Sequence, residues 1–137
     1  MNVLKRIRYE ITYLQMERLV KKALKDKQFK QFYIKFISGN DSVRGIGKSV
    51  ALARLSAKHG IPIVTTKARE NDYLLGITRE LPQYFKKGLP TTIVYNENVF
   101  RGRYIPYVLV DECPTGMFSK ILANLPADTK FIGYHYK

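Results

Sequence analysis

A short glycine-bearing segment, Ser42-Val43-Arg44-Gly45-Ile46-Gly47-Lys48-Ser49, most constrains how this chain can fold. The apolar run 32–37 before it predicts a β-strand, and residues 48–59 after it predict a helix that stops at Gly60. A loop of this composition between a strand and a helix is typical of a phosphate-binding loop. Strand, loop and helix then form the first unit of an α/β sheet.

The residue types in this loop suit phosphate chemistry. Gly45 and Gly47 let successive backbone N–H groups turn inward, and the start of the following helix adds positive potential. We expect Lys48 to reach the β- and γ-phosphates of a nucleotide and Ser49 to bind Mg²⁺ through its hydroxyl. The predicted nucleotide-binding residues are Ser42, Val43, Arg44, Gly45, Ile46, Gly47, Lys48, Ser49 and Val50.

The loop departs from the usual pattern at one position. The pattern G-x-x-x-x-G-K-[ST] begins with glycine, and Ser42 stands there in this chain. The alternative interpretation is a chance glycine-rich loop that happens to carry a lysine.

A second motif places two carboxylates, Asp111 and Glu112, directly after the apolar run 107–110. Such a run suits a buried parallel strand, and ligands bind at the carboxyl ends of strands in open α/β sheets. We expect Asp111 to hold Mg²⁺, directly or through water, and Glu112 to polarise the water that attacks the γ-phosphate. Without the upstream loop, two carboxylates that simply end a strand would be the better interpretation.

The remaining sequence alternates between strand and helix patterns. Strands are predicted at 61–65, 91–95 and 130–134, and helices at 71–87, with a break at Pro82, and 115–125. This pattern predicts an α/β fold with a mostly parallel sheet and helices on both faces. The length of 137 residues suits a single domain, which we divide into a helical N-terminal extension, 1–30, and a nucleotide-binding core, 31–137.

The N-terminal extension lacks Gly and Pro from residue 3 to 30, which predicts one or two helices. Ile7, Ile11 and Leu14 share one face, and Val20, Ala23 and Leu24 are expected to continue this apolar stripe.

The charge of the chain favours an anionic partner. The net charge is +13, and residues 1–35 hold ten basic and three acidic residues. Nucleic acid, with DNA favoured, is the expected partner. The candidate contacts are Lys21, Lys22, Lys25 and Lys27, with a merely solvated helix face as the alternative.

Composition also excludes several classes of protein. One cysteine allows no intramolecular disulfide and no multi-cysteine zinc cluster. No apolar run approaches the roughly 18–20 residues of a membrane span, and no membrane partner is expected. The first eight residues carry charge too early for a signal peptide, which predicts a cytoplasmic protein.

Together, the loop and the Asp-Glu strand resemble the additional-strand, catalytic-glutamate class of P-loop ATPases. Within this class the chain is most similar to phage DNA-packaging ATPase cores, those of large terminase subunits. The loop from Arg44 to Ser49 is similar to theirs, which often has an arginine just before the first of these glycines. Phe100-Arg101-Gly102-Arg103 is similar to the Arg-Gly element that often precedes their second motif. The resemblance implies a RecA/terminase-like core over about residues 32–135.

The resemblance also implies an activity and partners. It implies Mg²⁺-dependent ATP hydrolysis coupled to nucleic acid, such as DNA packaging or translocation, in a homo-oligomer. Arg44 would stabilise the transferring phosphate in cis, and Arg101 or Arg103 would act as an arginine finger across a subunit interface. A phage or plasmid replication or recombination ATPase, and a nucleic-acid-binding or assembly protein with little turnover, remain alternatives. A nucleotide kinase is less favoured, because no arginine-rich lid is evident.

Overall fold

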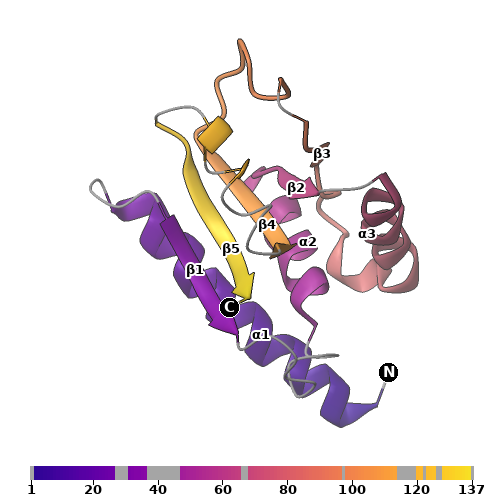
Figure 1. Cartoon of the computed structure of the whole chain (residues 1–137). Coiled ribbons are helices and arrows are strands. Elements are labelled where there is room, and N and C mark those ends of the chain that lie inside the picture. The colour runs from indigo at the N-terminus through magenta and orange to yellow at the C-terminus, as the bar shows by residue number, and fades with distance from the viewer. Residues whose placement is uncertain are drawn as a thin grey trace.

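Helices and parallel strands alternate along the chain from α1 to β3, and β4 follows β3 without a helix between them (Figure 1). The computed structural model describes residues 2–26, 31–36, 47–65, 68–96, 98–113, 120–121, 123–125 and 128–136, with the backbone alone for 31–36, 68–69, 111–113 and 134–136. In chain order the elements are α1 (Val3–Lys25), β1 (Gln31–Phe36), α2 (Lys48–His59), β2 (Ile63–Thr65), α3 (Ala68–Glu80), the 3₁₀ helix η2 (Pro82–Tyr84), β3 (Thr92–Val94), β4 (Tyr107–Cys113) and β5 (Lys130–Tyr136). Residues 120–121 and 123–124 are also helical.

Local chemistry sets the ends of the helices. The Asn2 side chain caps α1 by accepting a 2.7 Å hydrogen bond from the Lys5 N–H. Gly60 ends α2 in the left-handed conformation, with φ of 69°, which glycine adopts without a steric penalty. α3 ends at Glu80, two residues before Pro82, as the predicted break requires.

The five strands form one sheet in the order β1-β5-β4-β2-β3, and all four pairings are parallel. The α/β class with a parallel sheet and an N-terminal helix is therefore confirmed. Because the strands are parallel, their carboxyl ends meet at one edge of the sheet. The last strand, β5, lies between β1 and β4.

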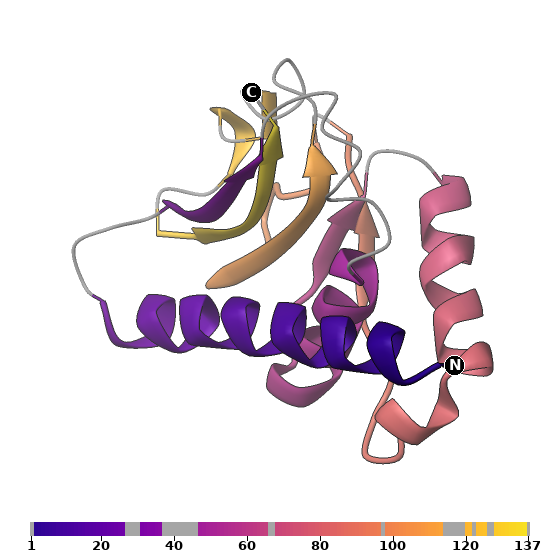
Figure 2. The ribbon, with the colours of Figure 1, turned by 90° about the horizontal axis from the view of Figure 1, so that it is seen from below.

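Alternate strand residues face two separate apolar cores. Ile63, Leu109 and Ile132 join the core that α1, α2 and α3 cover. Val64, Val110 and Phe131 join the opposite core, with Ile121 and the segment 99–105. Both faces carry helical residues, as predicted, but α1 and α2 lie together beneath one face of the sheet, with α3 beside them (Figure 2). No helix in the described part of the chain is both long and apolar enough to cross a membrane.

α1 is one continuous helix, but its apolar residues occupy two faces. Met16, Val20 and Ala23 are fully buried in the first core. Ile7, Ile11 and Leu14 are each about half exposed, and Leu24 is also exposed. The predicted continuous stripe is therefore wrong. At about 100° per residue, Met16 and Val20 lie on the opposite side of the helix from Ile7 and Ile11.

A buried carboxylate links α1 to α2. Glu17 accepts hydrogen bonds from the Tyr13 hydroxyl at 2.5 Å and from Lys58 Nζ of α2 at 2.9 Å, and Lys21 Nζ lies 3.3 Å away. Burial alone would raise the pKa of Glu17, but these hydrogen bonds outweigh it and lower the pKa to about 2. The same carboxylate raises the pKa of Lys58. The ionised form of Glu17 is thus part of the folded structure.

The end of α1 is tied to the last strand. Lys130, the first residue of β5, donates hydrogen bonds through Nζ to the backbone carbonyls of Ala23 and Asp26. Carbonyls at a helix C-terminus lack intrahelical partners, and a cation there is favourable.

We expect the stability of the fold to depend on the ionisation of Glu17. Its folded-state pKa lies below the ordinary value of 4.5, so its contribution is complete above about pH 4.5 and is lost as the pH falls toward about 2. The shift corresponds to an upper limit on the order of 3 kcal/mol. Urea denaturation at neutral pH and at about pH 3 measures the loss in the unmodified protein and in Glu17→Gln.

Glu80→Gln, on the exposed end of α3, is the matched control. It should keep the acid-dependent loss of stability of the unmodified protein, whereas Glu17→Gln should be less stable at neutral pH and lose less on acidification. Equal losses in all three proteins would contradict the prediction.

Candidate functional site

Four of the predicted site residues, Lys48, Ser49, Asp111 and Glu112, belong to the carboxyl edge of the sheet. In Figure 1 the arrowheads of β1 and β5 point toward the end of the sheet where α2 begins. Lys48 and Ser49 are the first two residues of α2, and Asp111 and Glu112 lie near the end of β4. The fold therefore brings the Gly-Lys-Ser end of the loop and the Asp-Glu pair to the same edge. The other predicted loop residues, Ser42, Val43, Arg44, Gly45 and Ile46, lie outside the described residues.

The start of α2 has the properties of an anion site. Gly47 adopts the left-handed conformation, with φ of 85°, and offers no side chain to cap the helix. The first turn contains no acidic residue, and Lys48 is 5% exposed, with Ser49 half-buried and Val50 buried. A buried cation at the positive end of a helix opposes the helix dipole, which an anion bound there would offset.

The N-terminal helix packs directly on this helix start. A methyl group built at Gly47 would lie 2.5 Å from Cδ1 of the Tyr9 ring, which belongs to α1. The sequence did not predict that Tyr9 lies beside the loop, because the spacing of α1 does not reveal which element its aromatic side chains meet. The positive φ and the neighbouring Tyr9 ring therefore both disfavour a side chain at position 47.

We expect Gly47→Ala to destabilise the fold more than Gly60→Ala does. Both glycines have positive φ, and alanine costs about 1–2 kcal/mol in that conformation. Only Gly47 also has a ring in the way, whereas a methyl group at Gly60 meets open space. Thermal unfolding of both variants measures the difference.

The double variant Tyr9→Ala with Gly47→Ala tests the assigned cause. Its loss should be smaller than the sum of the two single losses, because Tyr9→Ala removes the clash. Equal destabilisation by Gly47→Ala and Gly60→Ala, or strictly additive losses, would show that Tyr9 does not restrict Gly47.

A β-bulge occurs in β4 at the predicted carboxylates. Val110 pairs with Gly133 of β5 and Cys113 pairs with His135, so Asp111 and Glu112 together oppose one β5 residue. A regular strand sends consecutive side chains to opposite faces, and a bulge interrupts this alternation. Bulges are common beside active sites, because they change the direction of a side chain. The backbone thus departs from regular pairing at the Asp-Glu motif.

Gly133 lets β5 approach β4 just before the bulge. A methyl group built at Gly133 would lie 2.2 Å from the carbonyl oxygen of Val110. The obstructing atom belongs to the backbone of Val110, a fully buried residue in the middle of β4, so it cannot move without shifting the sheet. The absence of a side chain at Gly133 is therefore a requirement of this strand pairing.

Gly133→Ala should destabilise the fold by roughly 2–4 kcal/mol, because the added methyl group collides with the backbone of β4. Gly76→Ala in α3 is the matched control. Nothing lies within 4 Å of a methyl group at Gly76, and alanine should stabilise the helix by about 0.5–1 kcal/mol. Urea denaturation measures both changes. Unchanged stability of Gly133→Ala would mean that β4 and β5 separate easily at this point.

Two further buried oxygens lie near this edge. Thr65 Oγ1 and Asn71 Oδ1 have no hydrogen-bond partner within the described part of the structure. Thr65 ends β2, whose Val64 pairs with Val110 of β4, and Asn71 lies in α3, which begins three residues after β2 ends. Sequence reasoning missed both residues. The position of Thr65 at a strand's carboxyl end was the available signal.

Other predicted residues lie elsewhere. Arg101 and Arg103 are exposed in the turn that precedes β4, which Figure 1 places at the opposite end of the sheet from the start of α2. Lys21, Lys22 and Lys25 are exposed near the end of α1. Lys27 lies outside the described residues.

Comparisons with known proteins give no match. No family model matches the sequence, and no curated protein or solved structure is significantly similar to the chain. Within the described residues, no group of three or more His, Cys, Asp or Glu side chains is placed to hold a metal ion.

Proposed function

We propose that this protein binds and hydrolyses Mg²⁺-ATP and couples the hydrolysis to nucleic acid. One observation carries the proposal: Lys48 is buried in the first turn of α2, directly after left-handed Gly47, at the sheet edge where the Asp-Glu motif lies near the end of β4. This combination provides positive potential for phosphates and carboxylates for a metal ion and a water within one fold.

The strand order supports the assignment to the additional-strand, catalytic-glutamate class. The name of that class refers to a strand in addition to those that carry its two motifs. In this chain β1 precedes the loop, β4 carries Asp111 and Glu112, and β5 lies between them. The sequence motifs were the basis for the resemblance, so the strand order is independent support for it.

The proposed roles follow from the residue types. Lys48 contacts the β- and γ-phosphates, and Ser49 and Asp111 hold Mg²⁺, which neutralises phosphate charge when bound. Glu112 accepts a proton from the attacking water. Arg44, beside the loop glycines, stabilises the transferring phosphate.

The positions of Arg101 and Arg103 favour a role between subunits. Their turn lies at the opposite end of the sheet from α2's first residue, so they reach a nucleotide only in a neighbouring copy. The terminase resemblance favours a homo-oligomer that acts on DNA, as in packaging or translocation.

The departure at Ser42 favours a second candidate function. A nucleic-acid-binding or assembly protein with the same site would bind ATP with little turnover, because a non-glycine first loop residue restricts the loop backbone. Turnover measured with and without DNA or RNA distinguishes the two. Phosphate release that DNA or RNA stimulates supports ATP hydrolysis coupled to nucleic acid. Transfer of phosphate to an acceptor would indicate a kinase.

Lys48→Ala should abolish most ATP binding, because it removes the cation at the phosphates. Glu112→Gln should retain ATP while turnover falls by on the order of 100-fold, because the shape is kept and the base is lost. Titration calorimetry with Mg²⁺-ATP and phosphate-release assays measure the two effects. Lys120→Ala, an exposed lysine on the other face of the sheet, is the charge-matched control and should change neither. Unchanged binding in Lys48→Ala would refute the site, and unchanged turnover in Glu112→Gln would refute the assigned base.

A further inference from the structure

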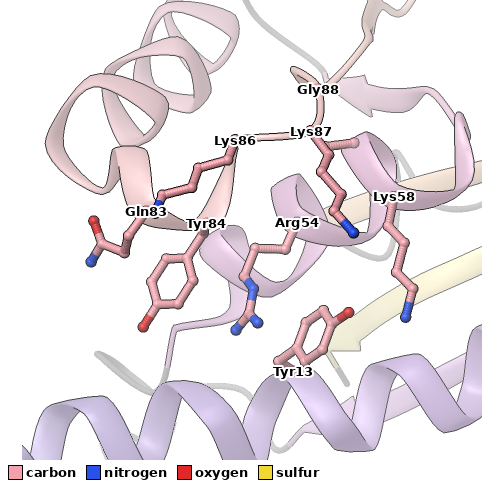
Figure 3. Close-up of a pocket in the computed structure, with 9 residues that line it drawn as sticks. Tyr13, Arg54, Lys58, Gln83, Tyr84, Lys86, Lys87 and Gly88 are labelled. Atoms are coloured by element: carbon pink, nitrogen blue, oxygen red, sulfur yellow. The ribbon is translucent and has the colours of Figure 1, made fainter.

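A second, strongly basic pocket lies on the helical side of the molecule. It encloses about 530 Å³ between α1, the second half of α2 and residues 83–88 (Figure 3). Its cationic lining residues are Arg54, Lys58, Lys86 and Lys87, and no Asp or Glu is among the described residues that line it. A cavity of this size accommodates a nucleotide-sized ligand.

Arg54 forms a fixed part of the pocket. Its guanidinium carbon lies 3.7 Å from the centre of the Tyr13 ring and 4.3 Å from the centre of the Tyr84 ring. Nη1 also donates to Glu10 Oε1 at 2.8 Å, and the side chain is 16% exposed. Figure 3 shows the Arg54 side chain between the two tyrosines. Stacking and ion pairing therefore hold Arg54 in one orientation.

The acidic residues near the pocket are already engaged. Glu10 is paired with Arg54, and Glu17 is paired with both Lys58 and Lys21. Lys86 and Lys87 are exposed at the rim. The carboxylates thus position Arg54 and Lys58, and Lys86 and Lys87 add positive charge that the lining residues do not balance.

The basic surface continues beyond the pocket. Glu17 contacts Lys58 in the pocket and Lys21 on α1, so these two lysines lie on either side of one carboxylate. A single small anion would fill only the pocket. A chain of phosphates would also extend along this row of cations.

This pocket is separate from the nucleotide site. Lys58 follows Lys48 by ten residues of the same helix, which corresponds to about 15 Å along its axis. The two sites therefore lie toward opposite ends of α2, and one ligand of nucleotide size does not occupy both.

We propose that this basic pocket binds the phosphodiester backbone of a single nucleic-acid strand, with Lys86, Lys87 and Lys58 as phosphate contacts. The inference rests on the proposed function, which it extends by locating the nucleic-acid site. A single strand fits because its backbone can enter a pocket of this volume, whereas a duplex is too wide to do so. Positively charged grooves beside aromatic side chains are typical of single-strand binding.

The test measures fluorescence anisotropy of a labelled oligothymidylate with the full chain, without ATP, at three salt concentrations. Lys86→Gln with Lys87→Gln should weaken binding by about tenfold or more at low salt and make the salt slope shallower by about 1.4, at about 0.7 per phosphate contact. The control is Arg8→Gln with Lys120→Gln, which removes the same charge from two exposed residues outside the pocket. It should have a clearly smaller effect on both quantities.

Competition identifies the source of the phosphate. Unlabelled oligothymidylate should displace the probe far better than inorganic phosphate or thymidine monophosphate at equal phosphate concentration. Equal displacement by the small anions would show a small-anion pocket and overturn the proposal. Equal weakening by the pocket and control variants, or no binding by the unmodified protein, would also overturn it.

ATP titrations on the same variants separate this proposal from the proposed function. The pocket variants should keep ATP affinity, and Lys48→Ala should keep oligothymidylate binding. Loss of strand binding only in the pocket variants supports the pocket even if no ATP binds at Lys48. If the pocket variants bind oligothymidylate as well as the unmodified protein does, and ATP binding and turnover are intact, the proposed nucleic-acid site is refuted and the proposed ATPase function is not.

Discussion

The parallel arrangement of all five strands is the constraint on which the rest of the structure depends. Parallel neighbours cannot be joined by tight hairpins, so each connection must return across the sheet before the next strand begins. The residues that directly follow β1, β2 and β4 consequently meet at one edge. Thr65 is the last residue of β2, the Asp111–Glu112 bulge lies near the end of β4, and Lys48 begins α2, the helix that follows β1 in the chain. The common direction of the strands therefore brings together candidate site residues that are far apart in the sequence.

Sequence reasoning succeeded where local chemistry decides the outcome. Gly47 and Gly60 bound α2 as expected, and Pro82 separates α3 from η2. The apolar run before Asp111 also predicted a buried parallel strand, although β4 extends through the acidic pair to Cys113. In each case, a backbone preference or a short hydrophobic run contains the information needed.

Sequence reasoning failed where tertiary packing decides. Both faces of α1 carry apolar residues, so periodicity could not indicate that Met16 and Val20 face the sheet while Ile7 and Ile11 remain exposed. The bulge in β4 depends on pairing with β5, which is distant in sequence. The pocket around Arg54 requires α1, α2, η2 and the segment after η2 together, and its lining residues belong to none of the motifs in the sequence. Nonlocal contacts of this kind leave no local pattern.

α1 is in contact with both candidate sites. Tyr9 lies against Gly47 at the start of α2, and one turn later Tyr13 stacks on Arg54 in the basic pocket. The apolar residues Met16, Val20 and Ala23 anchor the rest of the helix in the shared core. The helical extension that the sequence set apart from the nucleotide-binding core is thus packed against α2 along much of its length. Any displacement of α1 would alter the surroundings of both sites.

The central place of β5 determines the order in which the fold can form. β5 follows the other four strands in the chain and is therefore synthesised after them, yet among the described strands β1 pairs only with β5, and β4 lacks one of its two neighbours until β5 is made. The anchor from Lys130 to the end of α1 likewise joins residues 107 positions apart. Contacts of such sequence separation slow folding, and unpaired strand edges favour aggregation while they last. A nascent chain that ends before β5 therefore exposes the edges of β1 and β4 that β5 later covers.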